Sequence, residues 1–375
     1  MKEKRVRVFT AFSGYDSQCM SLDRLGVEYE LVGWSEIDKS AIKAHNAIYP
    51  EWSERNYGDI SKIEWDRVSD FDVFTYSFPC QDISVSGLQR GFREGSGTRS
   101  SLLWECRRAI GEKRPEWLIM ENVKNLVSKK NMPLFREWLR YLEGEGYKNY
   151  VKVIDGSEMG VPQHRERVFC VSTLSNEKYE FPQPVSLDKV LRDYLEEDVD
   201  DRYYYGEEKT KKVLEERKRL GKGERADKIN WIGDMYNGSQ RGRVISIDGI
   251  APSLCCRECD VVILEPINLA KGEISYAIKP MYGRPSYKFC IDGGHYPVTG
   301  AIDNYKGLRR LTEREAYRLM GVSEENIDKI LSADICRGAH YRLAGNSIIV
   351  DVLYYIFKQI FYPVRGENRQ LEIEF

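Results

Sequence analysis

The feature that most constrains this fold is a repeated alternation of strand-like and helix-like segments over the first 173 residues. Apolar, β-rich runs occur at residues 6–12, 29–34, 71–76, 117–120, 151–154 and 168–172. Segments with helical spacing lie between them, at residues 17–25, 39–48, 102–110 and 134–142. Parallel strands need a crossover connection, which is usually a helix. Repeated βα units therefore predict an α/β fold, with a mostly parallel, Rossmann-like sheet covered by helices on both faces.

The regular pattern stops at the Phe-Pro-Gln-Pro segment, residues 181–184, because two prolines in four residues interrupt helices and strands. The residues that follow are irregular and rich in Gly, Tyr and charge. Regular patterning returns after residue 306, where Thr312 and Glu315 form the pattern of a capping box at a helix start. We expect one large domain from residues 1–180 and 307–375, and a small, irregular, mostly-β domain from residues 181–306.

Composition is typical of a globular protein with a substantial core, since hydrophobic residues make up 42% and charged residues 31%. No stretch approaches the roughly 18 uninterrupted apolar residues of a membrane span. The first residues carry no signal-peptide pattern. The nine cysteines show no repeated spacing, which argues against a disulfide framework. These features favour a reducing, cytoplasmic setting and no membrane partner.

The sharpest candidate for chemistry is Cys80, in the sequence Ser-Phe-Pro-Cys-Gln after the strand-like run 71–76. In open α/β sheets, ligands bind outside the carboxyl ends of the strands, where this cysteine would lie. Pro79 restricts the local backbone and would hold the thiol in place. A buried, inert cysteine is the alternative interpretation, and position alone does not separate the two.

Two further polar signals adjoin apolar runs. Glu121 comes directly after the run 117–120, where an ionisable group is costly unless it has a partner or a function. Gln163, Arg165 and Arg167 alternate along an extended segment, so their side chains would share one face. Three long polar side chains on one face suit a bound base or phosphate. The alternatives are a salt-bridged glutamate at a strand end and an edge strand with a solvated face.

Taken together, these segments resemble the DNA cytosine-5 methyltransferase family. Its proline-cysteine, Glu-Asn-Val and Gln-x-Arg-x-Arg motifs occur here in the family's order. Five further segments are similar to family motifs, namely Phe12-Ser13-Gly14, Ser35-Glu36-Ile37-Asp38, Gly58-Asp59-Ile60, Arg309-Arg310-Leu311-Thr312 and Ala344-Gly345-Asn346-Ser347. The stretch between residues 167 and 307 matches little except around Ser253-Leu254, where the family usually has Thr-Leu. Eight motifs in the correct order leave little room for coincidence.

The resemblance implies methyl transfer from S-adenosylmethionine, which becomes S-adenosylhomocysteine, to carbon 5 of a cytosine flipped out of duplex DNA. It implies Cys80 as the nucleophile that adds to carbon 6. Glu121 would be the acid near N3, and Arg165 would hold O2, orient the ring and place positive charge near the thiol. The sequence does not identify the base that later removes the C5 proton.

The same resemblance implies a cofactor site along the carboxyl ends of the first strands. Glu36 would accept hydrogen bonds from the ribose hydroxyls. Asp59 would bind the adenine amino group, with Ile60 against the ring. The other residues assigned to this site are Phe12, Gly14, Ile37, Asn346 and Ser347.

Asp16 departs from the family pattern, because it stands where the first loop usually has the second glycine of Phe-x-Gly-x-Gly. Glycine at such a position permits positive φ and close backbone approach. Asp tolerates positive φ better than most residues. We expect its bulk and charge to lie beside the cofactor's amino-acid end, where they would attract the ammonium or repel the carboxylate.

Residues 181–306 would form a target-recognition domain, with double-stranded DNA as the partner. Between Arg202 and Arg243, twelve Lys and Arg outnumber seven Asp and Glu, which suits nucleic acid but equally a solvated helix face. The loop at residues 84–99 is rich in Gly and Arg, as expected of a mobile lid on phosphates or of a plain surface loop. The residues assigned to DNA contact are Gln81, Ser86, Arg99, Gln163, Arg167, Arg241, Arg243 and Ser253, with Asn237 and Gln240 as further base readers.

Several competing interpretations are weaker. A tRNA cytosine-5 methyltransferase would carry a Cys-Phe-Thr signature, and a nicotinamide dehydrogenase would carry G-x-G-x-x-G after its first strand, and neither occurs here. An inactive relative would have lost the cysteine or the glutamate. A zinc site at Cys256, Cys259, Cys290 and His295 lacks a second tight pair, so we expect no metal. We expect a monomer, since flipping one base needs one active site, and a cognate restriction endonuclease is a possible partner encoded separately.

Overall fold

The computed structural model describes residues 5–80, 83, 99–220, 227–235, 243–254, 261–266, 288–291, 294–297 and 305–363. The chain divides into two compact units. Unit 1 consists of Met1–Ile154, Glu166–Val185 and Ser347–Phe375, and unit 2 consists of Asp155–Arg165 and Ser186–Asn346. Each unit therefore contains segments that are distant in the sequence.

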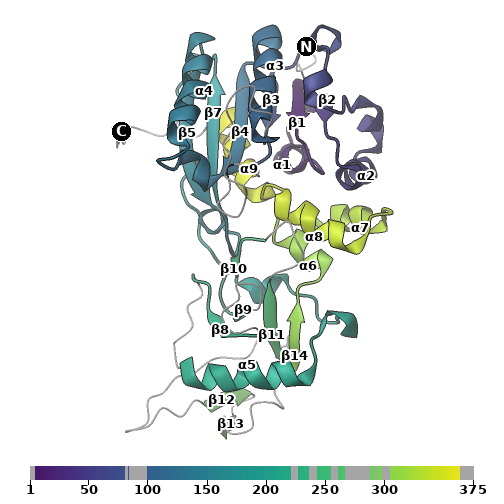
Figure 1. The fold of residues 1–375 in the computed structure, drawn as a ribbon, viewed down its shortest axis with the longest axis vertical. Helices are drawn as coiled ribbons and strands as arrows, with labels where there is room; N and C mark the ends of the chain where they lie inside the picture. The colour runs from purple at the N-terminus through teal and green to yellow at the C-terminus, as the bar shows by residue number, and fades with distance from the viewer. Residues whose placement is uncertain are drawn as a thin grey trace. The chain divides into compact units, whose positions relative to one another are not determined.

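Unit 1 is built on a six-stranded sheet with the order β2-β1-β3-β4-β7-β5 (Figure 1). Its strands are β1 (Val6–Ala11), β2 (Tyr29–Ser35), β3 (Val73–Tyr76), β4 (Trp117–Val123), β5 (Lys148–Asp155) and β7 (Glu166–Thr173). β1 pairs in parallel with both β2 and β3, and β3 pairs in parallel with β4. β7 runs antiparallel to β4. The predicted strands all form, and the predicted parallel pairing is confirmed for β1 to β4.

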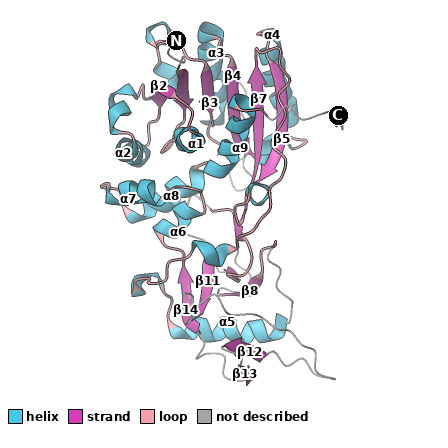
Figure 2. Ribbon diagram, turned by 180° about the vertical axis from the view of Figure 1, so that it is seen from behind, coloured by secondary structure: helices cyan, strands magenta, loops and turns pink. Residues whose placement is uncertain are grey.

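Helices cover both faces of this sheet, as the alternating pattern predicted. α3 (Cys106–Lys113) and α4 (Met132–Gly144) lie on one face (Figure 1). α1 (Ser17–Leu25) and α9 (Val350–Phe361) pack together on the other face (Figure 2). α2 (Lys39–Ile48) follows β2. The segment predicted as a helix at residues 102–110 begins instead as a 3₁₀ turn, Arg99–Glu105, which runs into α3.

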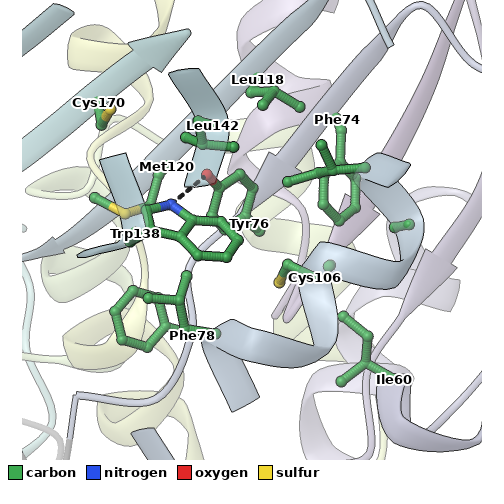
Figure 3. Packing of buried hydrophobic residues seen from close by; sticks show 14 of the residues in the cluster. Ile60, Phe74, Tyr76, Phe78, Cys106, Leu118, Met120, Trp138, Leu142 and Cys170 are labelled. Atoms are coloured by element: carbon green, nitrogen blue, oxygen red, sulfur yellow. Dashed lines mark hydrogen bonds between the residues drawn. The ribbon is translucent and has the colours of Figure 1, made fainter. Parts of the chain in front are cut away.

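An aromatic core lies beneath α3 and α4. Trp138 is fully buried, and its Nε1 donates a hydrogen bond of 3.2 Å to the Tyr76 hydroxyl (Figure 3). The rings of Phe74 and Tyr76 stack with centroids 5.2 Å apart. Phe78, two residues beyond β3, is 2% exposed and belongs to the same cluster. The core therefore anchors the chain on both sides of the point where β3 leaves the sheet.

Unit 2 contains a four-stranded sheet with the order β14-β11-β9-β8. Its strands are β8 (Trp231–Asp234), β9 (Arg243–Ile245), β11 (Val262–Pro266) and β14 (Tyr305–Arg310). β6 (Gln163–His164) pairs with β10 (Ala251–Pro252), and β12 (Lys288–Ile291) pairs with β13 (Gly294–Pro297). The helices of this unit are α5 (Glu207–Leu220), α6 (Glu313–Arg318), α7 (Glu324–Ser332) and α8 (Arg337–Asn346). Among the described residues of both units, no helix has the length and apolar character needed to span a bilayer.

The compact units divide the chain differently from the expected domains. The boundary between Val185 and Ser186 is close to the proline-rich segment that suggested one. Residues 307–346 were expected in the large domain, but they belong to unit 2. The reason is long-range pairing, since β14 lies beside β11 with Leu308 opposite Leu264. Residues 155–165 belong to unit 2 as well, and their strand β6 pairs with β10.

A buried ion network ties β11, β14 and α6 together. The Arg309 guanidinium is fully buried and lies 2.5 Å from Glu265 and 2.7 Å from Glu315. Glu315 also completes the predicted capping box: its carboxylate accepts from the Thr312 N–H, and the Thr312 hydroxyl accepts from the Glu315 N–H. Buried charges are tolerated where each is paired and hydrogen-bonded. The motif around Arg309 thus has a structural role in unit 2.

We predict that Trp138→Ala will destabilise the protein by about 3–5 kcal/mol, because it leaves a large cavity in the core and removes the bond to Tyr76. Urea unfolding followed by circular dichroism measures this change. Glu137→Ala, on the exposed side of α4, is the matched control and should shift stability by less than about 0.5 kcal/mol. Equal stability of the two variants would contradict the role given to this core.

Candidate active site

The parallel strands of unit 1 end at one edge of the sheet, and several candidate residues follow these ends. Phe12 and Gly14 follow β1, Glu36 follows β2, and Cys80 lies four residues beyond β3. β1 has β2 on one side and β3 on the other, so a topological switch point lies at the end of β1. Glu121 was expected just after its strand, but β4 continues to Val123, and Glu121 lies within it.

The backbone before Cys80 is fixed by two side chains. Asn122, from the Glu-Asn-Val segment of β4, donates a 2.8 Å hydrogen bond to the Phe78 carbonyl. The Ser100 hydroxyl donates a 2.6 Å bond to the Pro79 carbonyl. Cys80 itself is a half-buried cysteine outside any disulfide. The arrangement holds a thiol at a defined position at the carboxyl edge of the sheet.

Asn122 holds the backbone before Cys80, a role that sequence reasoning did not assign to it. Its side chain is 3% exposed. A buried amide almost always has hydrogen-bond partners, so an Asn at the end of an apolar strand indicates a nearby backbone group to hold. That signal was present in the sequence, but it did not say which carbonyl the amide would reach.

Glu121 is buried, with 8% of its surface exposed, and it pairs with Arg167. The distance from Arg167 Nε to Glu121 Oε1 is 3.2 Å. In the antiparallel register of β4 and β7, Val123 lies opposite Arg167, so Glu121 and Arg167 are diagonal neighbours on one face. On the other side of β4, Met120 lies opposite Tyr76, so β3 leaves the sheet beside Glu121. Arg167, expected at DNA, is therefore placed against the candidate acid.

Arg165 belongs to unit 2 and is 3% exposed. Its Nη1 donates to the Ser253 hydroxyl at 3.1 Å and to the Leu254 carbonyl at 3.2 Å. Its Nη2 donates to the Gly345 carbonyl at 2.9 Å. Two segments that resembled family motifs, around Ser253 and Gly345, are thus joined through one guanidinium.

Gln163, Arg165 and Arg167 do not share one set of partners, although their spacing suggested one face. The extended backbone is interrupted at Arg165, between β6 and β7. Gln163 is fully buried, and its amide donates to the Leu319 carbonyl at 2.9 Å. In this structure it presents no surface for a DNA contact.

Glu36 gathers backbone donors at the end of β2. Its Oε2 accepts from the Gly14 N–H at 3.0 Å, and its Oε1 accepts from the N–H groups of Ile37 and Asp38 at 2.7 and 2.8 Å. The Asn56 side chain bonds both the N–H and the carbonyl of Glu36. The carboxylate thus joins the loops after β1 and β2.

The two isoleucines expected near the cofactor differ in exposure. Ile37 is 69% exposed, whereas Ile60 is 2% exposed and packs in the main core. Asp59 precedes Ile60, and its Oδ1 accepts from the N–H and the hydroxyl of Ser61 at 3.0 and 2.8 Å. The bond from the Ser61 hydroxyl lowers the pKa of the Asp59 carboxyl. Ile37 therefore offers apolar surface next to Glu36, and Asp59 is held as a carboxylate.

Asp16 stands where the family usually has a glycine, and its backbone takes the left-handed conformation, with φ 68° and ψ 59°. Its side chain, however, is 0% exposed and points into unit 1. Oδ1 accepts from the Cys19 N–H at 3.3 Å, and Oδ2 accepts from the Thr10 hydroxyl at 2.9 Å. The carboxylate therefore caps α1 from within the protein and exposes no surface of its own.

The remaining described candidates lie near the C-terminal helices. Ser347 Oγ is 2.6 Å from Ser17 Oγ, at the first residue of α1. Asn346 ends α8 in unit 2 and is exposed.

The side chains of several candidates are outside the part of the chain that the structure describes. Gln81, Ser86, Asn237, Gln240, Arg241, Cys256 and Cys259 lie outside the described residues. For Arg99, Arg243, Cys290 and His295, only the backbone is described. Within the described part of the chain, no three His, Cys, Asp or Glu side chains are grouped as metal ligands.

Solved structures share this fold across nearly the whole chain. The S. pombe Dnmt2 methyltransferase matches with a TM-score of 0.63 at 18% identity, covering 96% of this chain and 100% of its own. The Entamoeba histolytica methyltransferase EhMeth matches with a TM-score of 0.68 at 16% identity, covering 96% and 98%. The fold is that of S-adenosylmethionine-dependent methyltransferases.

Sequence comparisons define the family. A type II methyltransferase of Lactococcus lactis subsp. cremoris, M2.ScrFI, is 34% identical over 408 residues, covering 95% of this chain and 99% of its own. An orphan methyltransferase of Bacillus phage SPbeta, M.SPBetaI, is 29% identical, covering 96% and 98%. The family model described as C-5 cytosine-specific DNA methylase matches residues 6–362. The chain therefore belongs to the C-5 cytosine-specific DNA methylase family and is a DNA (cytosine-5) methyltransferase.

Proposed function

We propose that this enzyme methylates carbon 5 of a flipped-out cytosine in a specific duplex DNA sequence, through a covalent bond between Cys80 and carbon 6 of the base. The observation that carries the proposal is that Cys80 follows β3 while Glu121 lies in β4, the parallel strand beside it. With Tyr76 opposite Met120, a nucleophile and an acid are offered at the same edge of the sheet. Carbon 5 is stacked within a duplex, so the base must leave the helix to be reached.

Cys80 supplies the nucleophile. Carbon 5 of cytosine reacts poorly by itself, and addition of a thiolate to carbon 6 raises its electron density. The thiol first loses its proton, since the thiolate is the reactive form. A new S–C6 bond then forms while the ring electrons move toward carbon 5 and N3. The fixed carbonyls of Phe78 and Pro79 support this role, because they limit motion of the attacking sulfur.

Glu121 and an adjacent arginine stabilise the charge that develops at N3 and O2. Glu121 would donate a hydrogen bond or a proton to N3. Arg167 is already paired with Glu121, whereas Arg165 uses its Nη groups on carbonyls and a hydroxyl of unit 2. We therefore propose Arg167, in place of Arg165, as the cation that orients the ring. Arg165 then acts as a scaffold residue.

The remaining steps complete the exchange. S-adenosylmethionine supplies an electrophilic methyl group on a sulfonium sulfur. Transfer of that methyl group to carbon 5 would leave S-adenosylhomocysteine. A base then removes the C5 proton, the C5–C6 double bond re-forms, N3 returns any proton taken from Glu121, and Cys80 leaves as a thiolate. No residue of the chain is assigned as that base.

The residues at the ends of β1 and β2 fit S-adenosylmethionine. Glu36 suits the ribose hydroxyls, and the exposed face of Ile37 suits the apolar adenine ring. At Gly14, with φ 60°, a Cβ would meet no atom within 4 Å, so the loop has open space there. Phe12, Asp59, Ile60 and Ser347 are the further residues of unit 1 proposed for this site.

Unit 2 would carry target recognition. Ser253 is proposed as a DNA contact in this unit. Its hydroxyl and the carbonyl of the next residue, Leu254, both accept hydrogen bonds from Arg165, which fixes the position of this segment. Arg241 and Arg243 are proposed as base readers, and Gln81, Ser86 and Arg99 as contacts of the loop after Cys80. We propose a monomer, which sedimentation at working concentration tests. Type II relatives suggest a separately encoded restriction endonuclease, whereas orphan relatives suggest none.

We predict that the wild-type protein will convert labelled S-adenosylmethionine into labelled 5-methyldeoxycytidine in duplex DNA, and that Cys80→Ala will lower this rate by about 10⁴-fold or more. Mass spectrometry of nucleosides from DNA and from tRNA measures both. Cys336→Ala, at an exposed cysteine, is the control and should keep normal turnover. Duplexes with 5-fluorocytosine should trap a denaturant-resistant adduct with the wild type alone. Label in tRNA only, or normal turnover by Cys80→Ala, contradicts the proposal.

We predict different defects for the two arginines. Arg167→Ala should slow single-turnover methylation by about 10²–10³-fold, because it removes a donor aimed at developing charge. Arg165→Ala should lower the free energy of unfolding by at least about 1 kcal/mol, because it leaves buried carbonyls of unit 2 without their hydrogen-bond donor. Rates and thermal unfolding are measured for both variants. A rapid Arg167→Ala enzyme beside a stable but inactive Arg165→Ala enzyme would return the orienting role to Arg165.

A further inference from the structure

Asp16 and His45 lie in contact, both buried, beneath the loop that follows β1. Both side chains are 0% exposed, and His45 Nε2 lies 3.5 Å from Asp16 Oδ2. Taking ionisable groups out of water is unfavourable unless their partners are well placed. The proposed chemistry uses neither residue. Their burial therefore calls for another role.

The Asp16 carboxylate joins three elements of unit 1. It accepts a hydrogen bond from the Thr10 hydroxyl in β1 and another from the Cys19 N–H at the start of α1. A carboxylate is favoured at a helix N-terminus, where unpaired N–H groups and the helix dipole attract negative charge. His45 contributes the third side, from α2.

His45 is itself held in a fixed orientation. Its ring stacks on Trp34, with centroids 3.7 Å apart and planes inclined by 20°. Trp34 Nε1 donates to the Trp52 carbonyl at 2.9 Å. Trp34 lies in β2, two residues before Glu36. The pair therefore links the loop after β1 to β2, the strand that directly precedes Glu36.

The loop of residues 12–16 has an unfavourable backbone conformation that these contacts stabilise. Phe12 and Asp16 both have positive φ, 56° and 68°, which is unfavourable for residues other than glycine and persists only where the surroundings enforce it. On the outer side, the loop is tied to Glu36 through the Gly14 N–H. If Glu36 binds the ribose, the ligand competes for that contact. The inner contacts through Asp16 are independent of the ligand.

We infer that Asp16 and His45 are positioning residues, a buried brace that keeps the loop of residues 12–16 in its ligand-binding conformation while Glu36 turns from Gly14 to the ligand. The inference rests on the proposed S-adenosylmethionine site. A glycine reaches a left-handed conformation without strain but is not held there. In this chain an aspartate reaches it, with hydrogen bonds from Thr10 and Cys19 and a contact with His45.

The test compares variants of Asp16 in the full chain by calorimetric binding of S-adenosylhomocysteine. Asp16→Gly removes every side-chain bond, and we expect Kd to rise about tenfold, as it does when the competent conformation is populated one tenth of the time. Asp16→Asn keeps an acceptor for Cys19 and a tolerance for positive φ, and should rescue most of the affinity. In kinetics, KM for the methyl donor should rise while kcat changes less than twofold. Lys43→Ala, on the exposed side of α2, is the control and should bind normally.

His45→Phe provides a second, independent variant, since it keeps an aromatic ring against Trp34 and removes the nitrogen that faces Asp16. If the two residues act as one brace, Asp16→Gly with His45→Phe should bind no more weakly than Asp16→Gly alone. Additive losses would overturn the brace, as would unchanged affinity in Asp16→Gly beside a wild type that binds. Absence of binding by the wild type would overturn the cofactor assignment first, and the inference with it.

Discussion

Parallel pairing of β1 with β2 and β3, and of β3 with β4, is the constraint on which the active site depends. The carboxyl ends of these four strands lie at one edge of the sheet. Residues from distant parts of the chain are therefore brought together there, although no local sequence pattern indicates it. The register then sets the detail. Because Tyr76 lies opposite Met120, the amide of Asn122 reaches the Phe78 carbonyl just before Cys80. Backbone pairing and one buried amide together position the backbone that carries Cys80.

Much of unit 1 was predictable from sequence, since its strands are nearly continuous apolar runs and its helices have clear spacing and caps. α1 and α2 form at the predicted residues. The domain boundaries were less predictable, because the pairing of β14 with β11 joins residues about forty positions apart with no local signal. At Asp16, too, one feature was predictable from sequence and another was not. Its backbone conformation followed from its position in the motif, but the direction of its side chain depended on Thr10 and on the start of α1.

The two arginines of the Gln-x-Arg-x-Arg segment show why a motif does not assign roles by itself. Alternation suggested that both side chains share a face, but the extended backbone breaks between them. Arg167 follows the register of β7 to Glu121, while Arg165 satisfies carbonyls in unit 2. Spacing identified the segment, and only the three-dimensional partners distinguish Arg167, the proposed orienting cation, from Arg165.

Unit 2 is built from two separate chain segments, which has a consequence for exchanging the proposed target-recognition unit among relatives. A graft of Ser186–Asn346 alone would leave Asp155–Arg165 with the recipient, although both segments belong to one unit. β10 would then pair with a foreign β6, and the carbonyls of Leu254 and Gly345 would depend on a foreign guanidinium. Exchange of the proposed target-recognition unit is therefore limited to donors whose residues 155–165 match, and that segment directly precedes β7.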